Sequence, residues 1–131
     1  MDELPIRSGD DVVRVRQQVR TAAAENGLSL VDQTKLVTAA SELARNTLVH
    51  GGGGLARVEV VKSSNGRTGI KLHFTDDGPG IADIGLALTD GWTSGSGLGL
   101  GLSGARRLVD EFELDSKPGA GTSVLVVKWS R

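Results

Sequence analysis

The sequence contains no cysteine, which excludes disulfides, a thiol nucleophile and a thiolate metal site. Aromatic residues make up only 3% of the 131 residues, so the 38% that are hydrophobic must come mainly from Leu, Val, Ile and Ala. The 15 basic residues are balanced by 16 acidic ones, without the basic excess that marks a nucleic-acid-binding surface. We therefore expect an aliphatic core and no nucleic-acid partner.

Long apolar runs are also missing. No stretch approaches the ~18 residues that a membrane-spanning helix requires, and the N-terminal "MDELPIRSGDD" is acidic and lacks the apolar segment of a secretory signal. These features predict a cytoplasmic protein with no membrane partner. The length is that of one domain, and no repeat or linker interrupts it, so we expect residues 1–131 to form a single domain.

Glycine, by contrast, is abundant. The chain has 19 glycines, whereas average usage of about 7% would give roughly nine. They gather in four clusters between segments that have regular hydrophobic patterns: Gly51–Gly54, Gly78–Gly80, Gly91–Gly104 and Gly119–Gly121. Such clusters at the junctions of helices and strands indicate backbone that must approach something closely.

Two helices are predicted in the first fifty residues. Ser8 to Asp11 has the composition of a helix start, and apolar residues then recur at helical spacing until Asn26-Gly27, which favours a helix end. A second helix is expected from about Asp32 to Val49. Four inward positions are expected in each helix: Val12, Val15, Val19 and Ala22 in the first, and Leu36, Ala40, Leu43 and Thr47 in the second.

The remainder predicts strands and two further helices. Residues 55–61 and 70–75 alternate between apolar and polar, and Asn65-Gly66 between them is a strong hairpin signal. A short helix is expected at 81–88, a third main helix through Ala105, Leu108, Val109 and Phe112, and two closing strands near 112–116 and 123–129. This order implies an α+β two-layer sandwich with a mostly antiparallel sheet.

The first motif with chemical content is "SELARNTLVHGGGG". Glu42 and Asn46 are four residues apart on the predicted second helix, which places them within about 5–6 Å on one face. His50 extends this face by one turn. A carboxylate beside a neutral amide suits a site where one group handles a proton and the other gives an oxygen to Mg²⁺. The alternative is an ordinary solvated helix face.

The second motif is "TDDGPGI", at the end of a predicted strand. A carboxylate at a strand end can accept a hydrogen bond from an exocyclic amine such as that of adenine, and the glycines free the turn around it. The alternative is an acidic surface turn, in which Asp, Gly and Pro are common.

The third motif, "GSGLGLGLSGARRLVDEF", runs into a helix start. Backbone N–H groups and the positive end of a helix bind phosphate readily. Neither a Rossmann fingerprint nor a Walker A sequence fits this stretch. The alternative is a flexible loop. The fourth motif, "GAGTSV", opens the last strand, and by itself indicates only a hairpin turn.

Taken in order, these four motifs resemble the N, G1, G2 and G3 boxes of the GHKL ATPase superfamily, which includes gyrase, the heat-shock-ninety chaperones, histidine kinases and MutL. The chain has no room for a histidine-kinase dimerisation domain or a transducer domain. Together with "DGWTSGSGLGLGL", "RRLVDEFELDS" and "KWSR", the motifs resemble the stand-alone serine/threonine kinases of bacterial partner switching, the RsbT type of the stressosome. His50-Gly51 departs from this type towards the sister anti-sigma kinases of the RsbW and SpoIIAB type.

The resemblance implies the Bergerat ATP-binding fold, a mixed, mostly antiparallel sheet covered by helices on one face, with ATP and Mg²⁺ as cofactors. By similarity, Glu42 would be the general base and Asn46 would bind nucleotide through the metal. Adenine would be bound by Asp76, Gly78, Gly80 and Thr122. The phosphates would be wrapped by Gly97, Leu98, Gly99, Leu100 and Gly101.

The implied activity is transfer of the γ-phosphoryl group to Ser or Thr of a STAS-domain protein. Kinases of this type also activate a PPM-class phosphatase by binding it. The alternative is an anti-sigma factor that sequesters a sigma factor and phosphorylates its antagonist. A plain ATPase clamp is disfavoured by the small size of the chain.

One absence within the motifs matters for phosphoryl transfer. No Lys or Arg occurs from Asp83 to Gly104, so the glycine-rich segment offers no side-chain cation to the γ-phosphate. Because phosphoryl transfer depends mainly on positioning and electrostatics, we expect a slow kinase. Arg45, next to Asn46, is a candidate for the missing cation, and the alternative is a solvated arginine on the flank of the helix.

Overall fold

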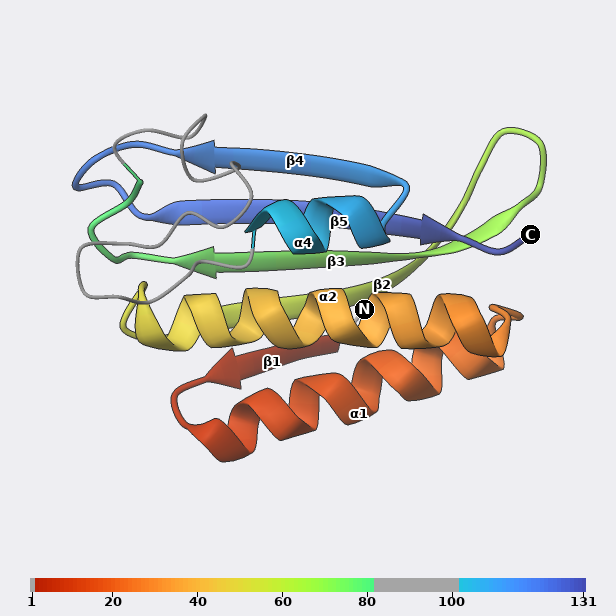
Figure 1. Cartoon of the computed structure of the whole chain (residues 1–131), viewed down its shortest axis with the longest axis horizontal. Coiled ribbons are helices and arrows are strands. Elements are labelled where there is room, and N and C mark those ends of the chain that lie inside the picture. Colours follow the sequence, from red (N-terminus) through yellow and green to blue (C-terminus); the bar gives the residue numbers. More distant parts are fainter. Residues whose placement is uncertain (1, 82–101) are drawn as a thin grey trace.

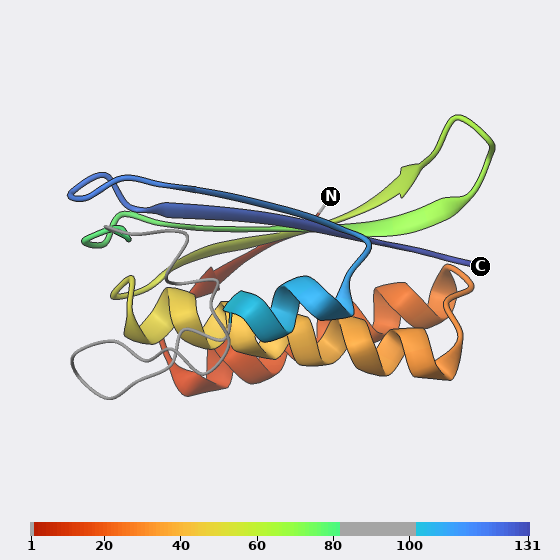
Figure 2. The same ribbon diagram turned by 45° about the horizontal axis from the view of Figure 1, so that its top comes forward.

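The computed structural model describes residues 2–81 and 102–131. The strands are β1 (Asp2–Ile6), β2 (Gly54–Lys62), β3 (Thr68–Asp76), β4 (Glu111–Ser116) and β5 (Thr122–Trp129), and the helices are α1 (Gly9–Glu25), α2 (Leu30–Val49) and α4 (Leu102–Leu108). The strands form one sheet in the order β1-β2-β3-β5-β4 (Figure 1), and all four pairings are antiparallel. In Figure 2 the described helices lie on one face of this sheet, and none of them covers the other face. The expected α+β two-layer sandwich with helices on one face is confirmed, but all pairings among the described strands are antiparallel, so this sheet is not mixed.

Helix α1 begins and ends where the sequence predicts. The Oγ atom of Ser8 accepts a hydrogen bond from the N–H of Asp11 at 3.4 Å, and Asn26 is the C-cap. The valines of the predicted stripe are buried, but in the last turn Ala23 is buried in place of the half-buried Ala22. The inward face therefore shifts by one residue at the end of the helix.

Helix α2 starts at Leu30, two residues before the predicted position, because Ser29 caps it by accepting the N–H of Asp32 at 3.1 Å. The four predicted inward residues are all buried. The helix packs against both α1 and α4 as well as the sheet, so more than one of its faces is covered. Its C-terminal end is thereby fixed against the ends of β2 and β3, where the candidate site lies.

The central hairpin is confirmed. Strands β2 and β3 pair from Gly54↔Asp76 to Lys62↔Thr68, and Gly66 takes a positive φ of 84° in the turn between them. Strand β1 was not predicted. It is a five-residue edge strand beside β2, and Pro5 is tolerated there because an edge strand leaves one side free of hydrogen-bonded neighbours.

The predicted third main helix is wrong in its extent. Helix α4 ends at Leu108, and the N–H of Asp110 already donates to the carbonyl of Val127 at 2.9 Å. Phe112 belongs to β4, from which it packs against the same core that the helical spacing suggested. The helix expected at 81–88 lies, apart from Ile81, outside the described residues.

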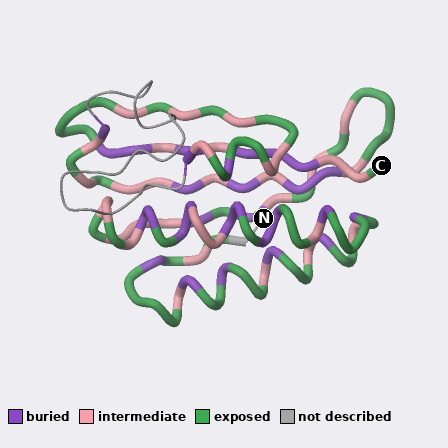
Figure 3. Tube along the Cα trace, in the orientation of Figure 1, coloured by how far each residue is buried: buried purple, intermediate pink, exposed green. Residues whose placement is uncertain are grey.

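The core lies between the sheet and the helices, and in Figure 3 buried positions recur along the helices and the central strands. Its largest fully buried side chains are Phe74, Ile6, Leu36, Leu43, Ile70, Leu72 and Leu102. Phe74 is the only aromatic among the buried hydrophobic residues of the described part, so the expected aliphatic core is confirmed. Within residues 2–81 and 102–131, no helix has the length and apolarity needed to cross a membrane.

Candidate functional site

The last two turns of α2 carry the first part of the site. Glu42, Asn46 and the C-cap residue His50 follow one another at four-residue spacing, and therefore lie along one side of the helix. Their environments differ. The side chain of Glu42 remains 39% exposed, whereas Asn46 is buried. A protein hydroxyl can reach the first residue, while the second points into the interior.

The Oδ1 atom of Asn46 is buried and has no hydrogen-bond partner among the described residues. Burying such an acceptor without a partner costs about 1–3 kcal/mol, so a buried oxygen left in this state requires an explanation. A hard cation that prefers oxygen ligands would satisfy it. No cluster of three or more His, Asp or Glu residues in the described ranges forms an alternative metal site. The residues present therefore fit a Mg²⁺ ion held by Asn46 together with the phosphates of a nucleotide.

Asp76, at the end of β3, lies against the chain that leaves α2. Its Oδ1 atom accepts the N–H of Gly78 at 2.9 Å, which closes a tight turn over the carboxylate. A Cβ atom on Gly51 would lie 2.6 Å from both Cβ and Oδ2 of Asp76, closer than real Cβ contacts. Only glycine at position 51 permits this contact, which brings the end of α2 and the Asp76 carboxylate together.

His50 fixes the same turn from the other side. Its Nε2 atom lies 3.1 Å from the carbonyl oxygen of Gly80, and since a carbonyl only accepts, the Nε2–H donates. Gly80 has a positive φ of 75°, and a side chain there would overlap the carbonyl of Lys117. The departure from the RsbT pattern at His50 thus has a structural role, which is to join α2 to the turn after β3.

Thr122, the first residue of β5, lies on the other side of Asp76 from α2. It pairs with Asp76 in the register of β3 and β5, and it is buried. The hydroxyl of Ser116 accepts the N–H of Ile81 at 2.8 Å, donates to the carbonyl of Gly121 at 3.0 Å, and lies 2.9 Å from Thr122 Oγ1. A serine hydroxyl has one hydrogen to donate, so Thr122 must donate to Ser116. Towards any further group, Thr122 Oγ1 can then only accept a hydrogen bond.

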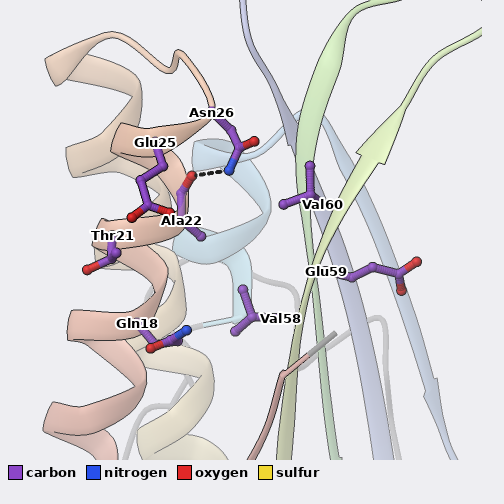
Figure 4. Close-up of a pocket in the computed structure, with 8 residues that line it drawn as sticks. All are labelled: Gln18, Thr21, Ala22, Glu25, Asn26, Val58, Glu59 and Val60. Atoms are coloured by element: carbon purple, nitrogen blue, oxygen red, sulfur yellow. Dashed lines mark hydrogen bonds between the residues drawn. The ribbon is translucent and has the colours of Figure 1, made fainter.

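Two hollows border Asp76 at this end of the sheet. One of about 560 Å³ is lined by residues 51–55 and 75–77, and the other, of about 290 Å³, by residues 75–76, 115–117 and 120–123. A separate hollow of about 430 Å³ lies between α1 and β2 (Figure 4). There, Asn26 Nδ2 donates to the carbonyl of Ala22 at 2.7 Å. None of the predicted site residues lines this third hollow, so it is distinct from the site.

The structure brings together the predicted residues of three separate motifs. Asn46 connects to Asp76 through Gly51, whose N–H donates to the Asn46 carbonyl at 3.1 Å, and Thr122 lies opposite Asp76. Five predicted phosphate-binding residues lie outside the described residues: Gly97, Leu98, Gly99, Leu100 and Gly101.

The contacts that two residues make in the site were not predicted from the sequence. Gly51 was noted as a departure in sequence and as part of a glycine cluster, which was the available signal for its contact with Asp76. Nothing in the sequence pattern indicated that Ser116 would hold Ile81 and Thr122 together.

Comparison with known proteins agrees with this geometry. Residues 31–130 match the family described as histidine kinase-, DNA gyrase B- and HSP90-like ATPase, HATPase_c, and the chain belongs to this family of ATPases. It is 45% identical over 121 residues to the serine/threonine-protein kinase RsbT of Bacillus subtilis (strain 168), covering 92% of this chain and 90% of that protein. It is 28% identical to the anti-sigma F factor of Thermoanaerobacter sp. (strain X514), covering 87% of this chain and 82% of the other.

Solved structures support the fold. The RsbU and RsbW domains of Rv1364c from Mycobacterium tuberculosis superpose with a TM-score of 0.64 at 23% identity, over all of this chain and 33% of that one. The mycobacterial sensor histidine kinase MprB gives a TM-score of 0.55 at 19% identity, over 99% of both chains. The expected resemblance to a GHKL serine/threonine kinase of the RsbT type, with an ATP-binding site, is confirmed.

Proposed function

We propose that this protein is a Mg²⁺-dependent serine/threonine kinase that phosphorylates a STAS-domain protein in a bacterial partner-switching pathway. The observation that carries the proposal is the pair formed by Glu42, which is partly exposed, and Asn46, whose buried Oδ1 has no partner among the described residues. The 45% identity to the kinase RsbT over most of both chains supports the same activity.

Glu42 is proposed to act as general base. As the oxygen of a substrate Ser or Thr attacks the γ-phosphorus, the hydroxyl proton passes to the Glu42 carboxylate. A new O–P bond forms, the bond from the γ-phosphorus to the bridging oxygen breaks, and ADP leaves. General-base assistance is typically worth ~10²–10⁴ in rate. The partial exposure of Glu42 suits an acceptor that belongs to another protein.

Asn46 is proposed to bind Mg²⁺ through Oδ1. The ion, when bound, would neutralise charge on the phosphates, and Asn46 would orient it without adding charge of its own. The residues of the glycine-rich segment, Gly97 to Gly101, are proposed by resemblance to wrap the phosphates.

Adenine selection is proposed to rest on two hydrogen-bond acceptors. Asp76 offers its carboxylate, and Thr122 Oγ1 donates its only hydrogen to Ser116 and can accept from a ligand. Adenine presents an amino group at its C6 position where guanine presents a carbonyl. A pair of acceptors therefore favours ATP over GTP.

The proposed partners are a STAS-domain substrate and a PPM-class phosphatase that the kinase activates by binding. The second candidate function is that of an anti-sigma factor, which the 28% identity to anti-sigma F factors supports. In that case the chain would sequester a sigma factor, and phosphoryl transfer would control its release.

The test is incubation with Mg²⁺ and γ-labelled ATP, with and without a STAS protein encoded beside this one. Wild type is compared with Glu42→Ala, and Glu113→Ala, an exposed glutamate on β4, is the matched control. We expect label on a Ser or Thr of the STAS protein, reduced at least 100-fold by Glu42→Ala and unchanged by Glu113→Ala. Nucleotide binding without any transfer of label would contradict the kinase proposal and leave a nucleotide-dependent binding protein.

A further inference from the structure

The proposed general base is already bound by a cation. Nη1 of Arg45 lies 3.0 Å from Oε1 of Glu42, three residues earlier on α2. Both side chains are accessible, with 58% of Arg45 and 39% of Glu42 exposed. In the described part of the chain, this is the only hydrogen bond that the guanidinium makes, so most of its five N–H donors remain for another group.

A second ion pair with the same three-residue spacing provides a comparison for Glu42 and Arg45. Arg14 Nη1 lies 2.8 Å from Asp11 Oδ1 on α1. Asp11, however, also accepts the backbone N–H of Arg7 at 2.8 Å, so its carboxylate organises the start of the helix. Glu42 binds no backbone group in the described residues. The Glu42–Arg45 pair therefore contributes nothing comparable to the architecture of α2.

The position of Arg45 matches a requirement of the reaction. Residues 83–104 contain no Lys or Arg, and the other basic residue of α2, Lys35, is ten positions or about 15 Å away along the helix. Arg45 lies between Glu42 and Asn46 in the sequence. Because Glu42 must reach the hydroxyl that attacks the γ-phosphorus, a guanidinium hydrogen-bonded to Glu42 lies within reach of the γ-phosphoryl oxygens.

We propose that Arg45 binds the γ-phosphoryl group of ATP while it holds Glu42 in place, and that it thereby makes the site distinguish ATP from ADP. This inference rests on the proposed function, and it assigns Arg45 as the cation that the glycine-rich segment lacks. The planar fork of arginine can bind a carboxylate and a phosphoryl oxygen with different N–H groups, whereas lysine offers a single point charge. Charge on the γ-phosphoryl oxygens in the transition state would be stabilised by the same contact.

The experiment measures dissociation constants for Mg²⁺·ADP and for a non-hydrolysable Mg²⁺·ATP analogue by titration calorimetry. The proteins are wild type, Arg45→Ala, Arg45→Lys and the matched control Arg14→Ala. A charge-assisted hydrogen bond corresponds to roughly 10- to 100-fold in affinity. We expect Arg45→Ala to weaken the binding of the ATP analogue by this factor and the binding of ADP by less than about twofold.

Arg45→Lys should recover part of the lost affinity, and Arg14→Ala should bind both nucleotides like wild type. In steady-state assays, Arg45→Ala should also lower kcat, because Glu42 loses its orienting partner. Chemical denaturation checks that the variants are folded. If Arg45→Ala weakens the binding of both nucleotides equally, or of neither, the assignment of Arg45 is wrong. If wild type binds neither nucleotide, the proposed function itself fails and this inference fails with it.

Discussion

The two ends of α2 each contain a buried residue with a carboxyl or amide side chain, and these two side chains differ in their partners. Asp32, in the first turn, and Asn46, in the last, are 6% and 7% exposed and stand about 21 Å apart along the helix. Asp32 lies 3.6 Å from the cationic groups of both Lys128 and Arg131. Asn46 Oδ1 has no partner in the described residues. The two side chains are almost equally buried but differ in whether their polar atoms have partners. This difference separates a structural end of the helix from the end that is proposed to bind nucleotide.

The structural end is a closed network. Asp110 lies 3.4 Å from Lys128 Nζ and 2.9 Å from Arg131 Nη2, and it accepts the N–H of Trp129 at 2.8 Å. The start of α2, the connection from α4 to β4 and the end of β5 are thereby joined. Every charge in this network faces an opposite charge. At the other end, the Oδ1 atom of Asn46, which has no partner among the described residues, and the partly exposed carboxylate of Glu42 leave capacity for a ligand.

The largest effect on stability is expected from Lys128→Met. Lys128 is buried between Asp32 and Asp110, and its removal leaves Asp32 buried with Arg131 as its one remaining ion-pair partner among the described residues. We expect the free energy of unfolding to fall by about 3–5 kcal/mol, measured by chemical denaturation.

Lys35→Met, at an exposed lysine on the same helix as Asp32, is the control and should change stability by less than about 0.5 kcal/mol. A loss below about 1 kcal/mol for Lys128→Met would mean that the network is not the structural element described above. At a temperature where the variant is folded, phosphotransfer should persist.

A smaller effect of opposite sign is expected from Asn46→Leu. Replacing this amide, whose Oδ1 has no partner in the described part of the chain, by an apolar side chain of similar size should raise the free energy of unfolding of the ligand-free protein by up to about 1 kcal/mol. The same variant should lose stabilisation by Mg²⁺·ATP, which for wild type is about 2.7 kcal/mol at a ligand concentration 100 times Kd.

Asn46→Asp, which retains oxygen ligands, should keep part of that stabilisation. Full stabilisation of Asn46→Leu by Mg²⁺·ATP would remove Asn46 from the metal site, and the contrast between the two ends of α2 would then have no functional meaning.

The smallest effect is expected in the pH dependence of stability, and it comes from Asp110 in the network at the start of α2. Burial alone disfavours the charged form of Asp110, but the N–H of Trp129 and the charges of Lys128 and Arg131 outweigh it, and the pKa of Asp110 is lowered from its ordinary value of 3.8. A lowered pKa stabilises the fold at neutral pH, and this contribution is lost as the pH falls through 3.8 towards the folded value.

Asp110→Asn should therefore be less stable than wild type at pH 7, and the difference should shrink as the pH is lowered below 3.8. Denaturation curves at a series of pH values measure this. A difference that stays constant with pH would show that the carboxylate charge contributes nothing to the network.

Local patterns in the sequence predicted most of the elements. Ser8 and the valines of α1, the inward stripe of α2 and Asn65-Gly66 act through neighbours within a few residues, and each was found. Strand β1 was missed because an edge strand has little pattern of its own. The end of α4 was misplaced because Phe112 contacts the same core from a strand at a spacing that also fits a helix.

For the candidate site, too, the local motifs could be predicted and the contacts between distant segments could not. The motifs containing Glu42, Asn46, Asp76 and Thr122 were visible as spacings, and the resemblance gave them expected roles. That the motifs of Asp76 and Thr122 lie side by side could not be derived from spacing, because the Asp76–Thr122 pairing is a contact between two strands. The contact of Gly51 with Asp76 and the hydrogen bonds of Ser116 likewise join segments distant in sequence.

The sequence by itself determined the aliphatic composition of the core, both ends of α1, the inward stripe of α2 and the central hairpin, and it supplied the residues expected to carry nucleotide chemistry. These follow from side-chain periodicity and from capping and turn preferences, which act over a few residues. Only the tertiary structure decided that Asp32 is paired with two cations while Asn46 Oδ1 has no partner within residues 2–81 and 102–131, and that Arg45 binds Glu42 rather than solvent alone. Whether a polar group is satisfied depends on which distant segments pack against it, and packing is a property of the whole fold.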